Sequence, residues 1–256
     1  MRDMAEEYAV VDLEMTGLRS TRDRIIELAA VLVQDGEITA CFDRFVNPHR
    51  VLNSRIVRLT GITDEMVADA PDITEVLPEF LDFIGERTLI GHNLMADFSF
   101  IKQNAVNQSL TFERVGIDTL KIARKVLPEE QGKALDELSA FYQIEHTHAH
   151  RAGDDARATA QIFLRLRQEF GEAQPSLFVP KQLNYKAKKQ GPLTPVQKRD
   201  LMRLTAHYHI PADIEIDSLT KSEASRLIQR IHEEYGRLPG KEEENCHEED
   251  QFQEET

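Results

Sequence analysis

Two acidic residues stand at the end of an apolar stretch near the amino terminus, in Val10-Val11-Asp12-Leu13-Glu14. The apolar residues up to Asp12 predict a buried strand, and Thr16-Gly17 predicts the turn after it. Residues two apart on a strand point to one face, so Asp12 and Glu14 lie side by side. Two such carboxylates are costly unless a cation lies between them, and oxygen-only ligands favour Mg²⁺ or Mn²⁺. The alternative is a strand edge with two solvated acids.

Two further acids are expected at the same core. In the helix predicted over 154–170, Asp155 lies on the buried stripe, whereas Asp154 projects on a wetter face and reads as the N-cap. Asp155 therefore points inward from the first turn, where the helix dipole favours a negative charge. Asp97 repeats this pattern in a helix predicted over 94–105. The stripe beside Asp155 is formed by Thr159, Ile162, Phe163, Leu166 and Phe170.

His150 precedes Asp155 by five residues, with Gly153 between them. We expect His150 in the loop that leads into the helix, from which its side chain can reach the acids. A histidine beside a metal cluster suits a general base that activates water. A rival hypothesis is a zinc site made by His146-x-His148-x-His150, but alternate residues share a face only on a strand, and this stretch reads as a loop.

The elements that must position these residues follow in chain order. Strands are predicted over 25–33 and 37–46, joined by a turn at Asp35-Gly36. Short helices and strands then alternate: helices over 54–59, 72–84, 119–126 and 133–142, and strands over 89–92 and 116–118. Pro78 predicts a kink or a later start in the second of these helices. This order predicts an α/β layer fold with helices over a mixed sheet.

Composition limits the class of protein. The chain has 256 residues, which suits one good-sized domain plus a smaller piece. It has no long apolar run, so neither a membrane span nor a signal peptide is expected. The two cysteines form no C-x-x-C pair, which favours a reducing cytosol. The net charge of −14 argues against a bulk electrostatic hold on nucleic acid.

Three motifs stand in order: VVDLEMTGL, GHNLMADFSFI and HRAGDDARATAQIF. Together they resemble the three exonuclease motifs of the proofreading 3′→5′ exonuclease family, the epsilon-subunit-like DEDDh group of the ribonuclease H-like fold. The resemblance covers about residues 8–170. The four metal-binding acids and the histidine of that family map onto the residues already singled out, Asp12, Glu14, Asp97, Asp155 and His150.

The resemblance implies hydrolysis of phosphodiester bonds from a 3′ end, with two Mg²⁺ or Mn²⁺ ions and release of nucleoside 5′-monophosphates. It also implies that Thr16, Gly17 and Leu18 line the pocket of the 3′ nucleotide. For Phe98, packing under the substrate and a role in the core both remain open. His92 and Asn93 are expected to cap or buttress, and His92 is left outside the site.

A second resemblance lies after residue 171. Gln174-Pro175-Ser176-Leu177-Phe178 is similar to the pentapeptide with which bacterial replication and repair proteins bind the sliding clamp. As an extended segment it would place Leu177 and Phe178 in an apolar groove and anchor Gln174 at the other end. The alternative is that Leu177 and Phe178 fold back on the preceding domain.

The expected organisation has four parts. An exonuclease domain over 1–171 is followed by a linker with the clamp peptide over 172–192. A small helical module is expected over 193–238, with capping boxes at Thr194 and Thr220. Residues 241–256 hold eight acidic residues and one lysine, and we expect 239–256 to be a disordered acidic tail.

The sequence thus predicts a cytoplasmic exonuclease of replication or repair that acts on single-stranded or frayed 3′ ends of DNA. A sliding clamp is the expected partner, and a DNA polymerase is a further candidate. Two alternatives stay open: an exoribonuclease that trims RNA ends, since DLEMTGL is also similar to oligoribonucleases, and an adaptor that binds the clamp without catalysis.

Overall fold

The computed structural model describes residues 7–146, 149–211 and 215–238. The chain divides into two compact units, Met1–Lys189 and Gln190–Thr256, which are described separately. The predicted tail over 239–256 lies outside the described residues. In the described part of the chain, every helix is too short or too polar to cross a membrane.

The first unit is built on a six-stranded mixed sheet with the strand order β3-β2-β1-β4-β5-β6. Strands β1, β2 and β3 form an antiparallel meander, β4 and β5 run parallel to β1, and the short β6 is antiparallel to β5. Their bounds are β1 Glu7–Met15, β2 Ile25–Gln34, β3 Glu37–Phe45, β4 Thr88–Gly91, β5 Val115–Asp118 and β6 Lys181–Gln182.

The hairpin between β2 and β3 turns at Asp35 and Gly36, whose φ angles are 52° and 83°. Positive φ at both central residues is typical of the tight turn whose twist matches that of paired strands. The turn therefore fixes the register in which β2 and β3 leave it.

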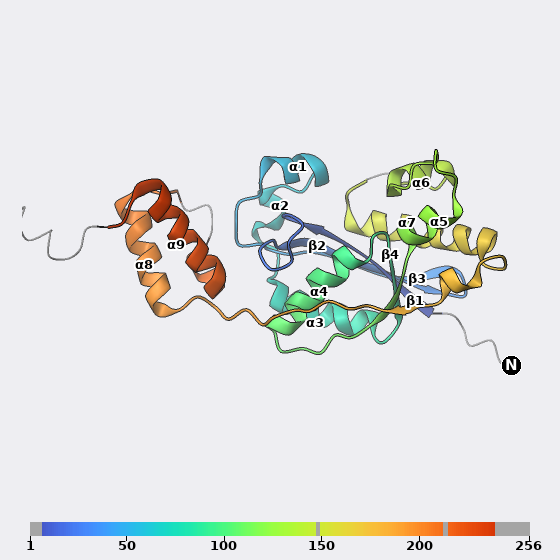
Figure 1. The fold of residues 1–256 in the computed structure, drawn as a ribbon, viewed down its shortest axis with the longest axis horizontal. Helices are drawn as coiled ribbons and strands as arrows, with labels where there is room; N and C mark the ends of the chain where they lie inside the picture. The colour runs from blue at the N-terminus through green and yellow to red at the C-terminus, as the bar shows by residue number, and fades with distance from the viewer. Residues whose placement is uncertain (1–6, 147–148, 212–214, 239–256) are drawn as a thin grey trace, which may run out of the picture. The chain divides into compact units, whose positions relative to one another are not determined.

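Helices cover both faces of the sheet (Figure 1). On one face α3 (Ile73–Ile84) and α4 (Met95–Asn107) pack against Ala9, Val11 and Leu13. On the other face α5 (Thr119–Val126), α6 (Leu135–Phe141) and α7 (Ala152–Phe170) pack against Tyr8 and Val10. The side chains of β1 thus alternate between two cores, as the period of a strand requires. Two short helices, α1 (Ser54–Thr60) and α2 (Asp64–Ala68), surround a smaller cluster.

The predicted linker is structured differently from the expectation. Pro175–Phe178 forms a 3₁₀ helix, η1, and the following Lys181–Gln182 is the edge strand β6. Leu177 and Phe178 pack against the core cluster beneath α7, and the Phe178 ring lies 6.1 Å from that of Phe163. The fold-back alternative therefore describes this structure, because burying two apolar side chains is favourable where a core surface is adjacent.

The second unit contains α8 (Pro195–His207), the 3₁₀ helix η2 (Ile216–Ser218) and α9 (Lys221–Tyr235). Capping boxes at Thr194 and Thr220 begin the two helices, as the sequence predicts. Its core is small, being formed by Leu201, Leu204, Leu219, Ala224 and Ile231.

Three local predictions need correction. Helix α3 begins at Ile73 and contains Pro78 in its interior, so the later start expected for this proline is wrong, and the kink stays a prediction. Helix α7 begins at Ala152 with Arg151 as its cap residue, and Asp154 therefore lies within the first turn instead of capping it. Asn93 adopts a left-handed conformation with φ of 67° and α4 begins only at Met95, so Asn93 turns the chain instead of capping the helix.

Candidate active site

Strand β1 supplies Asp12 and Glu14. Continuing the alternation of Tyr8 and Val10, both carboxylates lie on the face that α7 covers. The parallel pairing of β1 with β4 ends at Val10, so the acids lie beyond it, at the carboxyl end of the parallel strands. In open α/β sheets this edge is where ligands bind. Glu14 is buried and is opposite Glu27 in the antiparallel register with β2.

Helix α4 supplies Asp97 from its first turn, where the side chain is 5% exposed. Its carboxylate accepts the backbone N–H of Leu13 and its own backbone N–H. The bond from Leu13 connects Asp97 directly to the strand between Asp12 and Glu14. The turn before α4 is held in place by the Asn93 N–H, which donates to Asp118 at the end of β5 over 3.2 Å.

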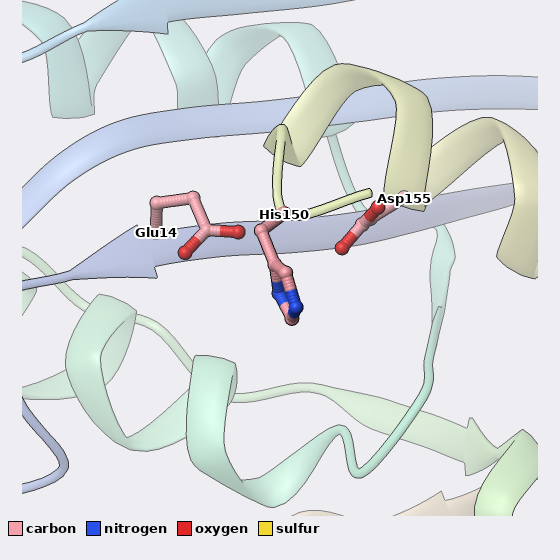
Figure 2. A group of neighbouring side chains, drawn as sticks. All are labelled: Glu14, His150 and Asp155. Carbon is pink, nitrogen blue, oxygen red and sulfur yellow. The ribbon is translucent and has the colours of Figure 1, made fainter. Parts of the chain in front are cut away.

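Helix α7 and the loop before it supply Asp155 and His150. Asp155 is 7% exposed in the first helical turn, whereas Asp154 is turned outward and pairs with Arg157 over 3.4 Å. The ligand atoms of Glu14, His150 and Asp155 all lie within 4.8 Å of one another. Figure 2 shows the His150 side chain between the two carboxylates. His150 has a φ of 64°, a conformation that is uncommon for a residue with a Cβ and that clusters at functional sites.

Burial raises the pKa of all four acids, and neighbouring carboxylates add to the rise for Asp12, Glu14 and Asp97. Burial, with the negative charges of Asp155, Glu27 and Asp97, raises the pKa of Glu14 to about 8. Burial raises the pKa of Asp97 to about 8 against the backbone hydrogen bonds it accepts. Burial and the charge of Asp97 raise the pKa of Asp12 well above its ordinary value. Burial also raises the pKa of Asp155, although its hydrogen bond with His146 opposes the rise. A site that raises the pKa of four acids together is short of positive charge.

This donor set fits divalent metal ions. Four inward-facing carboxylates from β1, α4 and α7, with an imidazole beside them, offer hard oxygen ligands, which suit Mg²⁺ or Mn²⁺. The predicted set of Asp12, Glu14, Asp97, Asp155 and His150 thus belongs to one neighbourhood. The zinc alternative includes His148, which lies outside the described residues.

His146 is a member of the site that the sequence did not indicate in this role. Its Nε2 lies 2.6 Å from Oδ1 of Asp155, and the two side chains are 7% and 10% exposed. The sequence suggested His146 only as a zinc ligand. Because nine residues of loop and helix separate the two partners, no periodic pattern could have paired them.

The loop after β1 carries the three residues predicted to line the nucleotide pocket. Thr16 is fixed by two bonds to Arg24: its N–H donates to the Arg24 carbonyl over 2.8 Å, and its hydroxyl accepts the Arg24 N–H over 2.9 Å. Gly17 faces the Asp23 carboxylate so closely that a Cβ would lie 2.5 Å from it. Leu18 is 88% exposed. A large apolar side chain on a braced loop beside the acids is available for contact with a ligand.

Phe98 and His92 have structural roles. Phe98 is fully buried and its ring lies 5.5 Å from that of Phe112, which favours the core role over packing under a substrate. Phe98 follows Asp97 directly, but successive helical residues point to different sides. His92 uses Nδ1 with the Thr119 hydroxyl and Nε2 with the Lys133 carbonyl, over 3.0 Å and 2.9 Å, which suits a buttress outside the site.

Residues 9–163 match the model of the exonuclease family. PolC-type DNA polymerase III of Caldanaerobacter subterraneus subsp. tengcongensis is 42% identical over 166 residues, which cover 65% of this chain and 12% of that protein. The same polymerase of Bacillus subtilis is 42% identical over 170 residues, with the same coverage. The chain therefore matches only about an eighth of the length of these relatives.

Solved structures share the fold. Exonuclease X in complex with 5′ overhanging duplex DNA is 26% identical, with a TM-score of 0.53 over 64% of this chain and 93% of that one. The nuclease domain of 3′hExo, a DEDDh family member bound to rAMP, is 21% identical, with a TM-score of 0.56 over 66% and 95%. Both match the ribonuclease H-like sheet and helices predicted from the sequence. The chain therefore belongs to the exonuclease family, whose members are hydrolases, and its exonuclease region is related to a part of PolC-type DNA polymerase III.

Proposed function

We propose that this protein shortens DNA strands from the 3′ end and releases nucleoside 5′-monophosphates, using two Mg²⁺ or Mn²⁺ ions. The observation that carries the proposal is the convergence of Glu14, Asp155 and His150 within 4.8 Å, next to Asp12 and Asp97. Burial and the charges of neighbouring acids raise the pKa of Asp12 and Glu14, and bound cations would favour the charged forms of these acids. Asp12, Glu14, Asp97 and Asp155 would hold the ions.

Bound divalent ions would stabilise the charge that develops on the attacking and leaving oxygens. His150, at the protein surface beside Glu14 and Asp155, accepts the proton of the attacking water. Thr16, Gly17 and Leu18 would bind the terminal nucleotide. The exposed Leu18 side chain would make an apolar contact that does not depend on the identity of the base, which suits an enzyme that removes any nucleotide.

DNA is proposed as the substrate because the relatives at 42% identity are DNA polymerases. On the same relationship we base the proposal of a role in replication proofreading or repair, in the cytoplasm and beside such a polymerase. RNA ends are the competing substrate and are distinguished by the test below.

The test uses end-labelled single-stranded DNA and RNA of one sequence with Mg²⁺, Mn²⁺ or EDTA. Asp155→Asn is expected to abolish shortening, whereas the matched control Asp154→Asn, which changes the outward-facing neighbour, is expected to keep it. Shortening of DNA from the 3′ end that requires metal supports the proposal, and faster shortening of RNA would reassign the substrate. If the wild type shortens neither, the clamp-binding adaptor without catalysis becomes the better hypothesis.

We also propose that Gln174, Leu177 and Phe178 bind a bacterial sliding clamp. Since Leu177 and Phe178 pack against the core here, binding requires η1 to leave that surface. Binding of the full chain to an immobilised clamp should be lost in the Leu177→Ala, Phe178→Ala double variant. It should be kept in Val179→Ala, whose side chain is 57% exposed in the next position. Equal binding by all three proteins would reject this role for the peptide.

The domain organisation is proposed on the same basis, with the catalytic domain over 1–171, the clamp-binding segment over 172–192, the helical module over 193–238 and an acidic tail over 239–256. Along the chain, the boundary between the two units falls between Lys189 and Gln190. The helical module has its own small core, which suits an appended interaction module.

A further inference from the structure

Glu27 is a buried carboxylate that the catalytic assignment leaves unexplained. It lies within the apolar strand β2, is 1% exposed, and is opposite Glu14 in the strand register. A fifth acid beside four others raises the electrostatic cost of the site. A buried carboxylate at such a position needs a partner that compensates its negative charge, and the structure shows this partner.

The hydrogen-bond partners of Glu27 are the cap residue and the first residue of helix α7. Oε1 of Glu27 accepts from Nη2 and Nε of Arg151 over 2.7 Å and 3.0 Å, and Oε2 accepts the backbone N–H of Ala152 over 2.8 Å. The Arg151 guanidinium also lies 5.0 Å from the centre of the Phe45 ring on β3. Nε of Arg151 also donates to Oε2 over 3.3 Å, so Nη2 and Nε bond both carboxylate oxygens in the two-pronged geometry that makes arginine pairs directional. One buried carboxylate thereby fixes two adjacent residues of the chain to the sheet.

The fixed residues stand between the two functional ones on this segment. His150 immediately precedes Arg151, and Asp155 lies one helical turn after it, with its N–H donating to the Arg151 carbonyl over 2.9 Å. His150 holds a left-handed backbone conformation, which persists only where the surroundings enforce it. On the sheet side, Glu27 is the cross-strand neighbour of Glu14. The Glu27–Arg151 pair therefore links the three residues whose ligand atoms converge.

We propose that Glu27 and Arg151 are positioning residues of the exonuclease reaction, which set the distance of His150 and Asp155 from Glu14. The proposal rests on the proposed function, in which these three groups hold metal and activate water. Groups behind the ligands of a metal site commonly change metal affinity or activity roughly 10–100-fold when they are removed.

The test compares Arg151→Ala, Arg151→Lys and Glu27→Gln with a matched control, Arg87→Ala. Arg87 also pairs with a glutamate of the sheet, Glu7, over 3.1 Å, but at the start of β1, away from the acids. The Arg151 side chain is 34% exposed, so Arg151→Ala is expected to fold even if Glu27→Gln does not. The measurements are kcat and KM on single-stranded DNA, and Mn²⁺ binding by electron paramagnetic resonance, which needs no turnover.

We expect Arg151→Ala and Glu27→Gln to lower kcat roughly 10–100-fold with KM changed less than about threefold, and to weaken Mn²⁺ binding. Arg151→Lys should recover only part of the loss, because lysine keeps the charge but not the paired donors. In the Glu27→Gln, Arg151→Ala double variant the loss should not exceed that of the worse single variant.

The proposal would be overturned if Arg151→Ala had the same kcat and Mn²⁺ affinity as Arg87→Ala. It would also be overturned if the fold-losses of kcat in the two single variants multiplied in the double variant. The proposed function fails separately, if wild-type protein does not shorten a 3′ end. In that case the Mn²⁺ titrations still decide whether the pair positions the acids.

Discussion

The two units of this protein bury carboxylates in opposite ways. In the second unit Glu223 is 8% exposed, and its Oε2 accepts the N–H and the hydroxyl of Thr220 over 2.9 Å and 2.8 Å, so its own helix cap satisfies it. In the first unit Glu14 is equally buried, but its neighbours are the acids of other elements, and its pKa rises to about 8. The difference separates a structural acid from a functional one: the first is paired within its own helix cap, whereas burial and the charges of other acids raise the pKa of the second.

The largest effect is expected from Asp12→Asn, which removes an acid whose pKa burial and the charge of Asp97 raise well above the ordinary value. Activity on a 3′-labelled strand should fall by at least about 10³-fold, since a ligand of the ions is lost. The melting temperature of the metal-free protein should stay unchanged or rise, because one repelling charge is removed. A large fall in melting temperature would show that Asp12 is a structural acid, like Glu223, and would remove the difference between the buried acids of the two units.

His150→Ala should lower kcat by roughly 10²–10⁴-fold, the range for loss of a general base. His92→Gln is a suitable control, because His92 contacts Thr119 and Lys133 outside the acid cluster and its loss should mainly affect stability. Steady-state kinetics and circular dichroism on both variants separate the two effects. Equal losses of kcat would argue against His150 as the base.

The raised pKa values predict how stability depends on pH. Glu14 and Asp97 ordinarily titrate at 4.5 and 3.8, and burial raises both to about 8 in the folded chain. Groups with raised folded pKa values stabilise the fold below their unfolded values and lose this contribution as the pH rises through the folded ones. The unfolding free energy of metal-free protein should therefore fall between about pH 4 and pH 8, measured by urea denaturation. Mg²⁺ should reduce the fall, and Glu14→Gln should flatten it.

The smallest effect on catalysis is expected from substitutions in the second unit. Leu204→Ala should destabilise this unit by about 2–5 kcal/mol, because Leu204 is 2% exposed in a core of few residues. Glu223→Ala should cost about 1 kcal/mol through loss of the capping box. Both variants should keep the kcat of the wild type on a short single strand. A loss of kcat in Leu204→Ala would show that the second unit contributes to the reaction.

Local patterns predicted most elements of the fold. Strands β1 to β5 and the helices α3 to α9 agree with the alternation, capping and turn signals of the sequence to within a few residues. The short α2 and the two-residue β6 were missed, because so few residues carry no readable period. The meander and the parallel strands follow from the order of elements, and this order predicted the α/β class.

The sequence by itself indicated which acids face the core. Asp12 and Glu14 share a face because of the period of a strand, and the period of a helix points Asp155 inward and Asp154 outward. Only the tertiary structure decided which residues support them. The bonds of His146 to Asp155 and of Glu27 to Arg151 join residues 9 and 124 positions apart, and η1 packs on a core surface made by distant segments. Such partners are chosen by the packing of whole elements, and periodicity describes only the face of one element at a time.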